Sequence, residues 1–515
     1  MAIKTDIATK NIVSKINSIL KHTSNSKTQF YTFCDEMIKQ HPELAKQMRV
    51  AVIEHRDIEN HVIEPLNRIV IELKTENGQK QICYFALNGE NATINNVDDN
   101  HKVVWKMPLA WYLKSYNNID KNEEYLLKNS SIKELSKKEP KNIPDENKIL
   151  SVNEIRKDVS TLARILIRGY VGWPYHGITT KIAVLDVLEY LYNKDQEMTI
   201  KEFKNKIGHI SRLIPDNHLQ TAYGRPKFRQ TFAGQNYAVD TNVFFGHIDN
   251  TAIVALKTLG NDRLSKEERF DLRNLTKWAS TNLPNSDALI VDLRGNGGGN
   301  DEHTNKFAKY LCGGVTNYPA IQEYVRTTKT ANKIAQPNKF EDIKKIHKLP
   351  DSEEPQLYQT KHATYKNGDI IYINTDKAYM KPIYILIDKR TGSSAERFVL
   401  AMRHHPMVRF VGDNSGGTEV FGNMSSEIYL PNSKAVIRVG THYRSLDREL
   451  GHDHYELHGL KPDIRCREGE DAMQVALKDI ENKQYTANFE QAATKIEQSM
   501  ATIKTNRLKK EEKTL

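Results

Sequence analysis

The sequence predicts an α/β protein in which helices cover a mainly parallel or mixed sheet. Strand-like and helical runs alternate between residues 240 and 411, which is typical of such folds. Two apolar strand runs, 288–293 and 384–387, are each followed directly by a turn of small residues. Because ligands bind beyond the carboxyl ends of strands in open α/β sheets, we look for chemistry in these two turns.

The chain has 515 residues, which is enough for two to four structural units. No apolar run reaches the roughly 18 residues of a transmembrane helix. The first residues lack the continuous apolar core and the cleavage site of a secretory signal. The four cysteines are scattered without metal-like spacing, which indicates reduced thiols. We therefore expect a cytoplasmic protein, or one exported by a route without a signal.

The charge pattern argues against a nucleic-acid partner. The chain carries 75 basic and 65 acidic residues, a net charge of +10, but the two signs are mixed along the sequence. The excess is explained by solubility and general surface potential. No phosphate-binding or dinucleotide-binding glycine pattern is present, so no cofactor is predicted.

Residues 1–128 are predicted to form a separate α+β domain of unknown role. Its elements are one amphipathic helix and three strands: 12–20, 68–74, 80–86 and 101–105. Asn77-Gly78 is a strong hairpin signal between the first two strands. Residues 129–150 are polar and interrupted by two prolines, so they are predicted to be a linker.

Residues 151–235 are predicted to form a helical subdomain. Three amphipathic helices are expected at 159–170, 182–191 and 199–213, the last opened by a capping box of Thr199 and Glu202. The third helix ends in the turn Pro215-Asp216-Asn217-His218, which presents a histidine.

Residues 236–482 are predicted to form the α/β core, and residues 483–515 an amphipathic helical tail. Beyond the two strands above, the core is expected to contain strand runs within 243–256, helices at 265–278 and 395–404, and strands at 369–373 and 408–411. A hairpin around Pro431-Asn432 joins strands at 427–430 and 435–439.

Each of the two small-residue turns has two interpretations. In Thr391-Gly392-Ser393-Ser394 a serine at a helix N-terminus is placed where the dipole favours a developing negative charge, but it is also a normal N-cap. The glycines at 297–299 can point amides at an oxyanion, or simply make a tight connection. These turns alone leave both interpretations open.

Five stretches in order resemble the C-terminal processing (tail-specific) serine peptidases. They are Asp-Leu-Arg-Gly-Asn-Gly-Gly-Gly at 292–299, Thr-Gly-Ser-Ser-Ala-Glu at 391–396, Val-Gly-Asp at 411–413, Gly-Leu-Lys-Pro-Asp-Ile at 459–464, and the histidine turn at 215–218. The resemblance covers residues 151–482. It implies a crotonase/ClpP-like mixed-sheet catalytic core, with the helical subdomain before it and a separate α+β N-terminal domain.

The resemblance also implies the site residues. One branch of the family uses a Ser/Lys dyad, but Thr418 stands at the lysine position here. The tricorn-like branch, which includes the interphotoreceptor retinoid-binding modules, uses histidine and glutamate instead. The implied residues are Ser393 as nucleophile, His218 as general base and Glu456 as orienting carboxylate, with amides of Gly297 or Gly298 and of Ser394 as the oxyanion hole.

The resulting hypothesis is a serine endopeptidase that cleaves proteins or peptides through an acyl-enzyme. Too few residues lie between His218 and Val243 for the PDZ domain that many relatives insert there. The domain at 1–128 then either replaces that device or inhibits the site. A homo-oligomer formed through this domain or through the C-terminal helix stays open.

Two alternatives belong to other classes of protein. The first is a catalytically inactive binding module on the same fold, suggested by the missing lysine. The second is a metal-dependent hydrolase, because His454, Glu456 and His458 share one face if their segment is a strand. Ser394 stays a minor candidate for the nucleophile, and Asp292 with Arg294 is expected to be a structural pair that holds the glycine loop.

Overall fold

A computed structural model describes fifteen segments of the chain: 35, 37–46, 48–56, 62–74, 80–86, 95–96, 101–222, 241–314, 322–326, 328–335, 357–359, 376–403, 405–445, 459–467 and 469–482. The chain forms two compact units. Unit 1 comprises Met1–Pro226, Arg326–Leu357 and Asn423–Thr441, and unit 2 comprises Lys227–Val325, Tyr358–Gly422 and His442–Leu515.

A five-stranded antiparallel sheet opens unit 1. Its strands are β1 (Met48–Arg56), β2 (Val62–Lys74), β3 (Lys80–Ala86), β4 (Asn95–Asn96) and β5 (His101–Pro108), in the order β4-β3-β2-β1-β5. The expected strands at 68–74, 80–86 and 101–105 are confirmed. Strand β1, which lies between β2 and β5, was not predicted. The expected helix at 12–20 and the Asn77-Gly78 turn lie outside the described residues.

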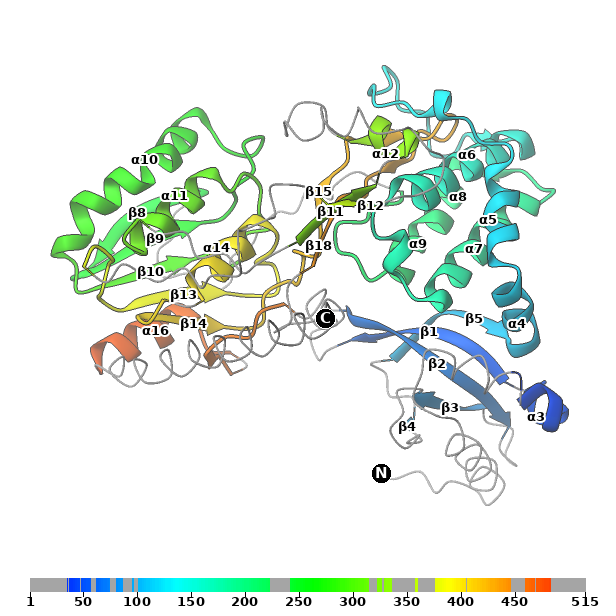
Figure 1. Cartoon of the computed structure of the whole chain (residues 1–515), viewed down its shortest axis with the longest axis horizontal. Helices are drawn as coiled ribbons and strands as arrows, with labels where there is room; N and C mark the ends of the chain where they lie inside the picture. The colour runs from blue at the N-terminus through cyan, green and yellow to red at the C-terminus, as the bar shows by residue number, and fades with distance from the viewer. Residues whose placement is uncertain are drawn as a thin grey trace, which may run out of the picture. The chain divides into compact units, whose positions relative to one another are not determined.

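One short helix of unit 1, α3 (Pro42–Ala45), precedes the sheet in sequence. The others follow it: α4 (Leu109–Asn117), α5 (Ile119–Leu127), η1 (Ile132–Glu134), α6 (Val152–Arg164), η2 (Ile165–Gly169), η3 (Trp173–Tyr175), α7 (Ile178–Asn193), α8 (Ile200–Gly208), α9 (Ile210–Leu213) and α12 (Lys329–Ile334). Helices α5, α6 and α7 pack on one another (Figure 1). The expected capping box at Thr199 and Glu202 is confirmed, and a second one at Ser151 and Glu154 opens α6.

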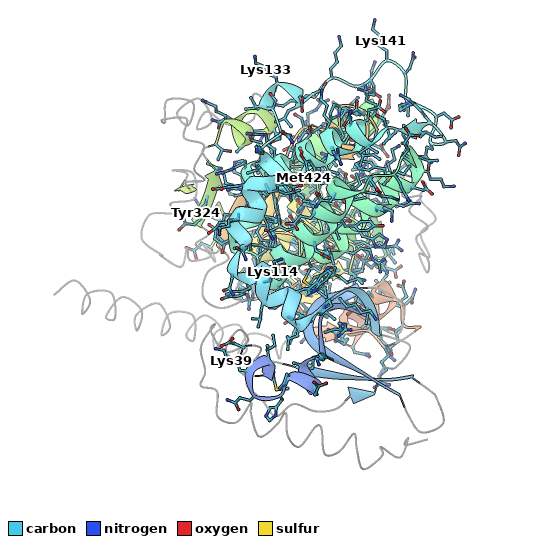
Figure 2. All side chains as sticks on the ribbon, turned by 90° about the vertical axis from the view of Figure 1, so that its right-hand side faces the viewer. Lys39, Lys114, Lys133, Lys141, Tyr324 and Met424 are labelled. Carbon is cyan, nitrogen blue, oxygen red and sulfur yellow. The ribbon has the colours of Figure 1, made fainter. Side chains whose placement is uncertain are left out.

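One apolar cluster holds the sheet and the helices of unit 1 together. It includes Val50 and Val52 of β1, Trp105 of β5 and the buried faces of α6 and α7. The Trp105 indole donates a hydrogen bond to Asp186 of α7 at 2.8 Å, which satisfies its polar edge. Lysines such as Lys133 and Lys141 are exposed and point away from this core (Figure 2).

Short strand pairs complete unit 1. Strands β6 (Ile149–Leu150) and β7 (Met198–Thr199) pair antiparallel, as do β16 (Ile428–Tyr429) and β17 (Val436–Ile437). The second pair confirms the predicted hairpin. Asp158 of α6 is fully buried and holds the hairpin loop, because its carboxylate accepts hydrogen bonds from the backbone N–H groups of Asn432 and Ser433 at 2.8 and 2.7 Å.

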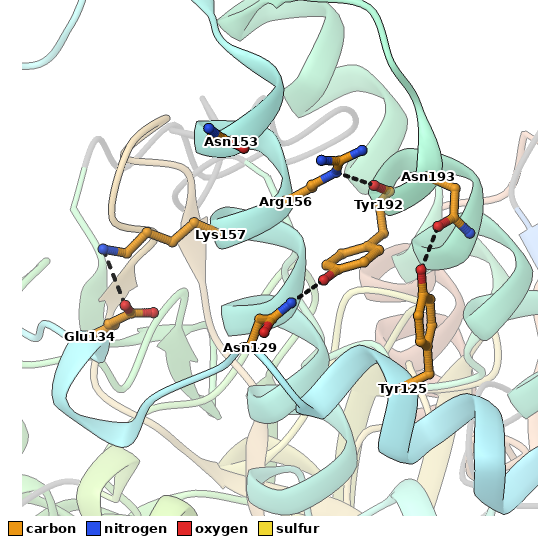
Figure 3. A pocket seen from close by; sticks show the side chains of 8 residues that line it. All are labelled: Tyr125, Asn129, Glu134, Asn153, Arg156, Lys157, Tyr192 and Asn193. Carbon is orange, nitrogen blue, oxygen red and sulfur yellow. Dashed lines mark hydrogen bonds and ion pairs between the residues drawn. The ribbon is translucent and has the colours of Figure 1, made fainter.

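A polar pocket of about 520 Å³ lies on the surface of unit 1. Its lining residues are Tyr125, Asn129, Glu134, Asn153, Arg156, Lys157, Tyr192 and Asn193. Most of them bond to one another, as Figure 3 shows. The Arg156 Nε donates to the Tyr192 carbonyl at 3.1 Å, and the Tyr125 hydroxyl donates to Asn193 at 2.7 Å. These polar groups are thus engaged with each other.

Unit 2 is built on a six-stranded mixed sheet. Its strands are β8 (Val243–Ile248), β9 (Thr251–Leu256), β10 (Ala288–Asp292), β13 (Ile383–Ile387), β14 (Val408–Gly412) and β19 (Ile464–Arg465), in the order β19-β14-β13-β10-β9-β8. Only β8 is antiparallel to its neighbour, β9; the pairs from β9 to β19 are parallel. The predicted α/β core with a mixed sheet is confirmed.

Helices cover both faces of this sheet. Helices α10 (Lys266–Asn282, followed by η4, Leu283–Asn285), α11 (Glu302–Leu311) and α14 (Ser394–Met402) lie on one side, and α16 (Ala472–Glu481) lies on the other (Figure 1). Alternate strand residues, among them Ile290, Tyr384 and Val411, pack with Met473 of α16. Four strands of this sheet, β9, β10, β13 and β14, therefore have apolar residues in continuous buried runs, or nearly so.

A smaller sheet contains β11 (Gln322–Arg326), β12 (Leu357–Gln359), β15 (Phe421–Met424) and β18 (Gly440–Ser445). Strands β11 and β18 pair antiparallel, with Tyr324 opposite Tyr443. The expected strand at 369–373 and the tail helix within 483–515 lie outside the described residues. Among the helices that the structure describes, none is long and apolar enough to cross a membrane.

Replacement of Asp158 by alanine is expected to destabilise unit 1 by about 3 kcal/mol, because two buried backbone N–H groups lose their acceptor. Thermal unfolding followed by circular dichroism measures this. The matched control is Asp195→Ala, at an exposed position after α7, which should leave the melting temperature unchanged. Equal melting temperatures for both variants would contradict the assignment.

Candidate active site

The two small-residue turns meet at one edge of the unit 2 sheet. Strands β10 and β13 are parallel neighbours, so the turns that follow them leave the sheet side by side. Two hydrogen bonds of 2.9 Å tie the turns together: the Gly392 N–H donates to the carbonyl of Asn296, and the Thr391 hydroxyl donates to the carbonyl of Leu293. Segments about a hundred residues apart in sequence thus form one rigid unit.

Ser393 occupies the N-cap position of α14 in a strained conformation. Its φ and ψ angles are 53° and −124°. Of the described residues other than glycine, only Asp249, Asn423 and Lys434 also have a positive φ. Such a conformation costs roughly 1–3 kcal/mol and persists where the surroundings enforce it. A sharp strand-to-helix turn of this kind presents the nucleophilic serine in α/β-hydrolases.

The glycine loop lies directly against Ser393. Gly298 has a φ of +89°, and a Cβ atom built on it would lie 2.8 Å from both the Ser393 Cβ and the Ser394 nitrogen. Gly299 is packed as closely against Leu259, where a Cβ atom would lie 2.1 Å from the carbonyl carbon. Glycine is therefore required at both positions, by conformation and by space.

The amides of the predicted oxyanion hole differ in their availability. The Gly298 N–H donates to the side-chain oxygen of Asn296 at 2.9 Å, so it is already engaged. The amides of Gly297 and Ser394 make no hydrogen bond to another residue within the described part of the chain, and Gly297 is exposed. The Ser394 hydroxyl donates to the Gly299 carbonyl at 2.7 Å, which indicates a structural rather than nucleophilic hydroxyl.

Asp292 and Arg294 hold the base of the glycine loop. The Arg294 guanidinium donates to both carboxylate oxygens of Asp292, at 2.9 and 2.7 Å, and also to Asp471 at 2.9 Å. Burial by itself would lower the pKa of Arg294, but the two carboxylates raise it above its ordinary value. The structure thus gives these two residues the structural pairing that the sequence suggested.

His218 lies in unit 1, in a turn held by a buried carboxylate. Its backbone N–H donates to Asp216 Oδ1 at 2.7 Å, and Asp216 Oδ2 accepts from the Tyr170 hydroxyl at 2.6 Å. The Tyr170 hydroxyl also lies 2.8 Å from His176 Nε2. Burial raises the pKa of Asp216 to about 7, although the hydrogen bonds from Tyr170 and the His218 N–H oppose this shift. The pairing of His218 with Ser393 of unit 2 stays a prediction.

Glu456, His454 and His458 lie outside the described residues. The segment that follows them in sequence is described and anchored: the Leu460 N–H donates to the Ser415 hydroxyl at 2.7 Å, and the Ser415 N–H donates to the Leu460 carbonyl at 3.0 Å. Within the described part of the chain, no group of three or more potential metal ligands is found.

The sequence analysis missed a second buried carboxylate, Glu396, beside Ser393. It stands three residues into α14, and its side chain is fully buried. In the sequence, Glu396 marked only the end of the nucleophile stretch at 391–396 or a residue in the first turn after an N-cap, and no role was assigned to its side chain. Its partners Ser415 and Thr418 come from a distant loop, so no local pattern could reveal them.

Comparison with known protein families identifies the family of the segment that contains the two turns. The model of peptidase family S41 matches residues 250–466. These residues belong to peptidase family S41. The S41 segment contains the glycine loop, Ser393 and Glu456, and it makes the chain a serine-type peptidase by family, as the sequence motifs indicated. No relative was found among curated proteins.

Several solved structures match parts of this chain at low identity. A presumed peptidase of Parabacteroides merdae is 18% identical over 63% of this chain and 96% of its own, with a TM-score of 0.38. A lipoprotein from Streptococcus agalactiae is 18% identical over 64% and 96%, with a TM-score of 0.36. The photosystem II D1 C-terminal processing protease is 14% identical over 42% and 43%, with a TM-score of 0.24. Because these scores lie below 0.5, the family assignment rests on the sequence match.

Replacement of Gly298 by alanine is expected to reduce peptidase activity at least ~100-fold, because the new methyl group would displace the Ser393 turn. Hydrolysis of a fluorogenic peptide by the purified variant measures this. Gly177→Ala is the matched control, since that glycine has a φ of −60° and open space around its Cβ position. Wild-type activity in Gly298→Ala would show that the loop does not approach the reacting serine.

Proposed function

We propose that this chain is a serine endopeptidase that cleaves peptide bonds through an acyl-enzyme. Ser393 is the nucleophile, His218 the general base and Glu456 the carboxylate that orients the imidazole. The observation that carries the proposal is the strained turn of Ser393 at the N-terminus of α14, packed against Gly298 of the glycine loop.

The chemistry follows from what a serine needs at neutral pH. The hydroxyl must lose its proton as it attacks the carbonyl carbon of the substrate, and imidazole has a suitable pKa to accept that proton. The imidazolium then returns it to the leaving amine, which leaves an ester on Ser393. Water repeats the sequence and releases the acid.

Negative charge develops on the carbonyl oxygen of the substrate in both steps. The amides of Gly297 and Ser394 are the best candidates to bind it, because they are not engaged with other described residues. The Gly298 amide could contribute only after releasing Asn296. One such donor is worth about 3 kcal/mol of transition-state stabilisation, and the α14 dipole adds to it.

The base and the nucleophile belong to different units in this proposal. His218 is part of unit 1, and its backbone is fixed there by Asp216. Ser393 is part of unit 2. The mechanism therefore requires the His218 imidazole to reach the Ser393 hydroxyl.

The substrate is a protein or peptide, as the family implies. The sequence-based domains at 1–128, 129–150, 151–235, 236–482 and 483–515 are kept as part of the proposal. The first of them is assigned to substrate selection or to inhibition of the site. A homo-oligomer through that domain or through the tail helix is a further element that sedimentation would test.

A fluorophosphonate probe tests the assignment, because it reacts with activated serines. Labelling and peptide cleavage are expected to disappear in Ser393→Ala and to fall at least ~100-fold in His218→Ala and Glu456→Ala. Ser280→Ala, an exposed serine of α10, should label as the wild type does.

Other outcomes identify the alternatives. Activity that survives Ser393→Ala but is lost to a chelator would replace the proposal by a metal-dependent hydrolase built on His454, Glu456 and His458. Folded wild-type protein that neither labels nor cleaves peptides would leave a binding module on the peptidase fold.

A further inference from the structure

We propose that Glu396 and Thr418 are positioning residues that hold Ser393 in its reactive conformation. The proposal rests on the nucleophile assignment above and deepens it. Neither side chain is proposed to touch the substrate. They act on the backbone of the nucleophile through a buried network of hydrogen bonds in unit 2.

The Glu396 carboxylate is the centre of this network. Its Oε1 accepts hydrogen bonds from the Ser415 hydroxyl at 2.5 Å and the Gly417 N–H at 2.8 Å. Its Oε2 accepts from the Thr418 N–H at 2.8 Å, the Thr418 hydroxyl at 2.9 Å and the Ser393 N–H at 3.2 Å. Five donors thus converge on one fully buried carboxylate.

Such a set of donors matches an ionised carboxylate. Each of the two oxygens can accept several hydrogen bonds, whereas a protonated or amidated side chain would bring a donor against other donors. Charge-assisted hydrogen bonds are the stronger ones, and they gain further strength in a buried network. The network therefore fixes every group that contributes to it, including the Ser393 backbone.

Thr418 bridges the carboxylate and the nucleophile. Its hydroxyl accepts a hydrogen bond from the Ser393 N–H and donates its own proton to Glu396. It also lies against the preceding residue, since a Cβ atom built on Gly392 would lie 2.8 Å from the threonine oxygen. The peptide plane between Gly392 and Ser393 is thereby held in the orientation that the positive φ of Ser393 requires.

Thr418 also stands at the position that a lysine occupies in one branch of the family. The motif resemblance of the 412–422 stretch places the lysine of the Ser/Lys branch at this position. Here the residue binds the main chain of the nucleophile and the buried carboxylate. The loop that carries a catalytic group in that branch thus serves in this chain to shape the nucleophile turn.

Ser415 extends the network to the segment that follows Glu456. Its hydroxyl donates to Glu396 and accepts from the Leu460 N–H at 2.7 Å. Gly459, with a φ of +63°, packs so closely on Ser415 that a Cβ atom there would lie 2.1 Å from its carbonyl oxygen. The same carboxylate thus anchors both the nucleophile turn and the chain that leads back to the proposed orienting glutamate.

The test replaces Thr418 by valine, which keeps the shape of the side chain and removes the hydroxyl. We expect kcat to fall roughly 10- to 100-fold with little change in KM, because the lost hydrogen bonds touch the nucleophile and not the substrate. The rate of fluorophosphonate labelling at Ser393 should fall by a similar factor. Thr418→Ser, which restores the hydroxyl, should recover both values to within about threefold.

A matched control is Thr251→Val. Thr251 is also buried, but it pairs with Ala288 at the amino end of β10, at the opposite end of the strands from the glycine loop. This variant should keep wild-type kcat and labelling rate, whatever its effect on the melting temperature. Glu396→Gln, in which a donor replaces an acceptor, should lose at least as much activity as Thr418→Val.

Three results would overturn the proposal: wild-type kcat and labelling in Thr418→Val, a loss that appears in KM alone, or a loss that Thr418→Ser does not rescue. If Thr418→Val fails to fold, the network is tested with Ser415→Ala, and Thr418→Ser serves as the variant that keeps the hydroxyl. Wild-type labelling in Ser415→Ala would equally contradict the proposal. Failure of the proposed function is distinct, because the wild-type protein would then not label at Ser393.

Discussion

Parallel pairing of β10 with β13 is the interaction on which the candidate site depends. It brings the carboxyl ends of two strands to one edge, and the hydrogen bonds from Gly392 to Asn296 and from Thr391 to Leu293 then join the turns that follow. Because Gly298 has no side chain, the glycine loop can touch Ser393 directly. The site is thus built mainly by backbone geometry, which the buried sheet beneath it keeps rigid.

Two buried carboxylates play the same part in the two units. Asp216 accepts the backbone N–H of His218 in unit 1, and Glu396 accepts that of Ser393 in unit 2. Each carboxylate also accepts a hydrogen bond from a hydroxyl group, that of Tyr170 or that of Thr418. A buried acceptor that binds main-chain amides fixes a short turn more firmly than apolar packing does, because it is costly to leave such groups unpaired. The proposed catalytic residues are therefore both held through their backbones.

Much of the fold could be predicted because its signals are local. The capping box of Thr199 and Glu202, the strands that precede the glycine loop and the serine turn, and the hairpin near Pro431-Asn432 all appear where turn chemistry and periodicity placed them. Strand β1 was missed, since its apolar run at 50–53 is only four residues long and periodicity alone cannot distinguish such a run from part of a helix. The nucleophile turn could be identified from the family motifs for the same reason, because these motifs are short and continuous in sequence.

The sequence by itself determined the α/β class, the family of the 250–466 segment and the identity of the two turns. Only the tertiary structure decided which polar groups meet. Glu396 accepts a hydrogen bond from Thr418, 22 residues away in sequence, and Asp158 accepts one from Ser433, 275 residues away. The Gly298 amide donates to the Asn296 side chain. The physical reason is that periodicity and turn preference act over a few residues, whereas the partner of a buried polar group is set by sheet register and packing between distant segments.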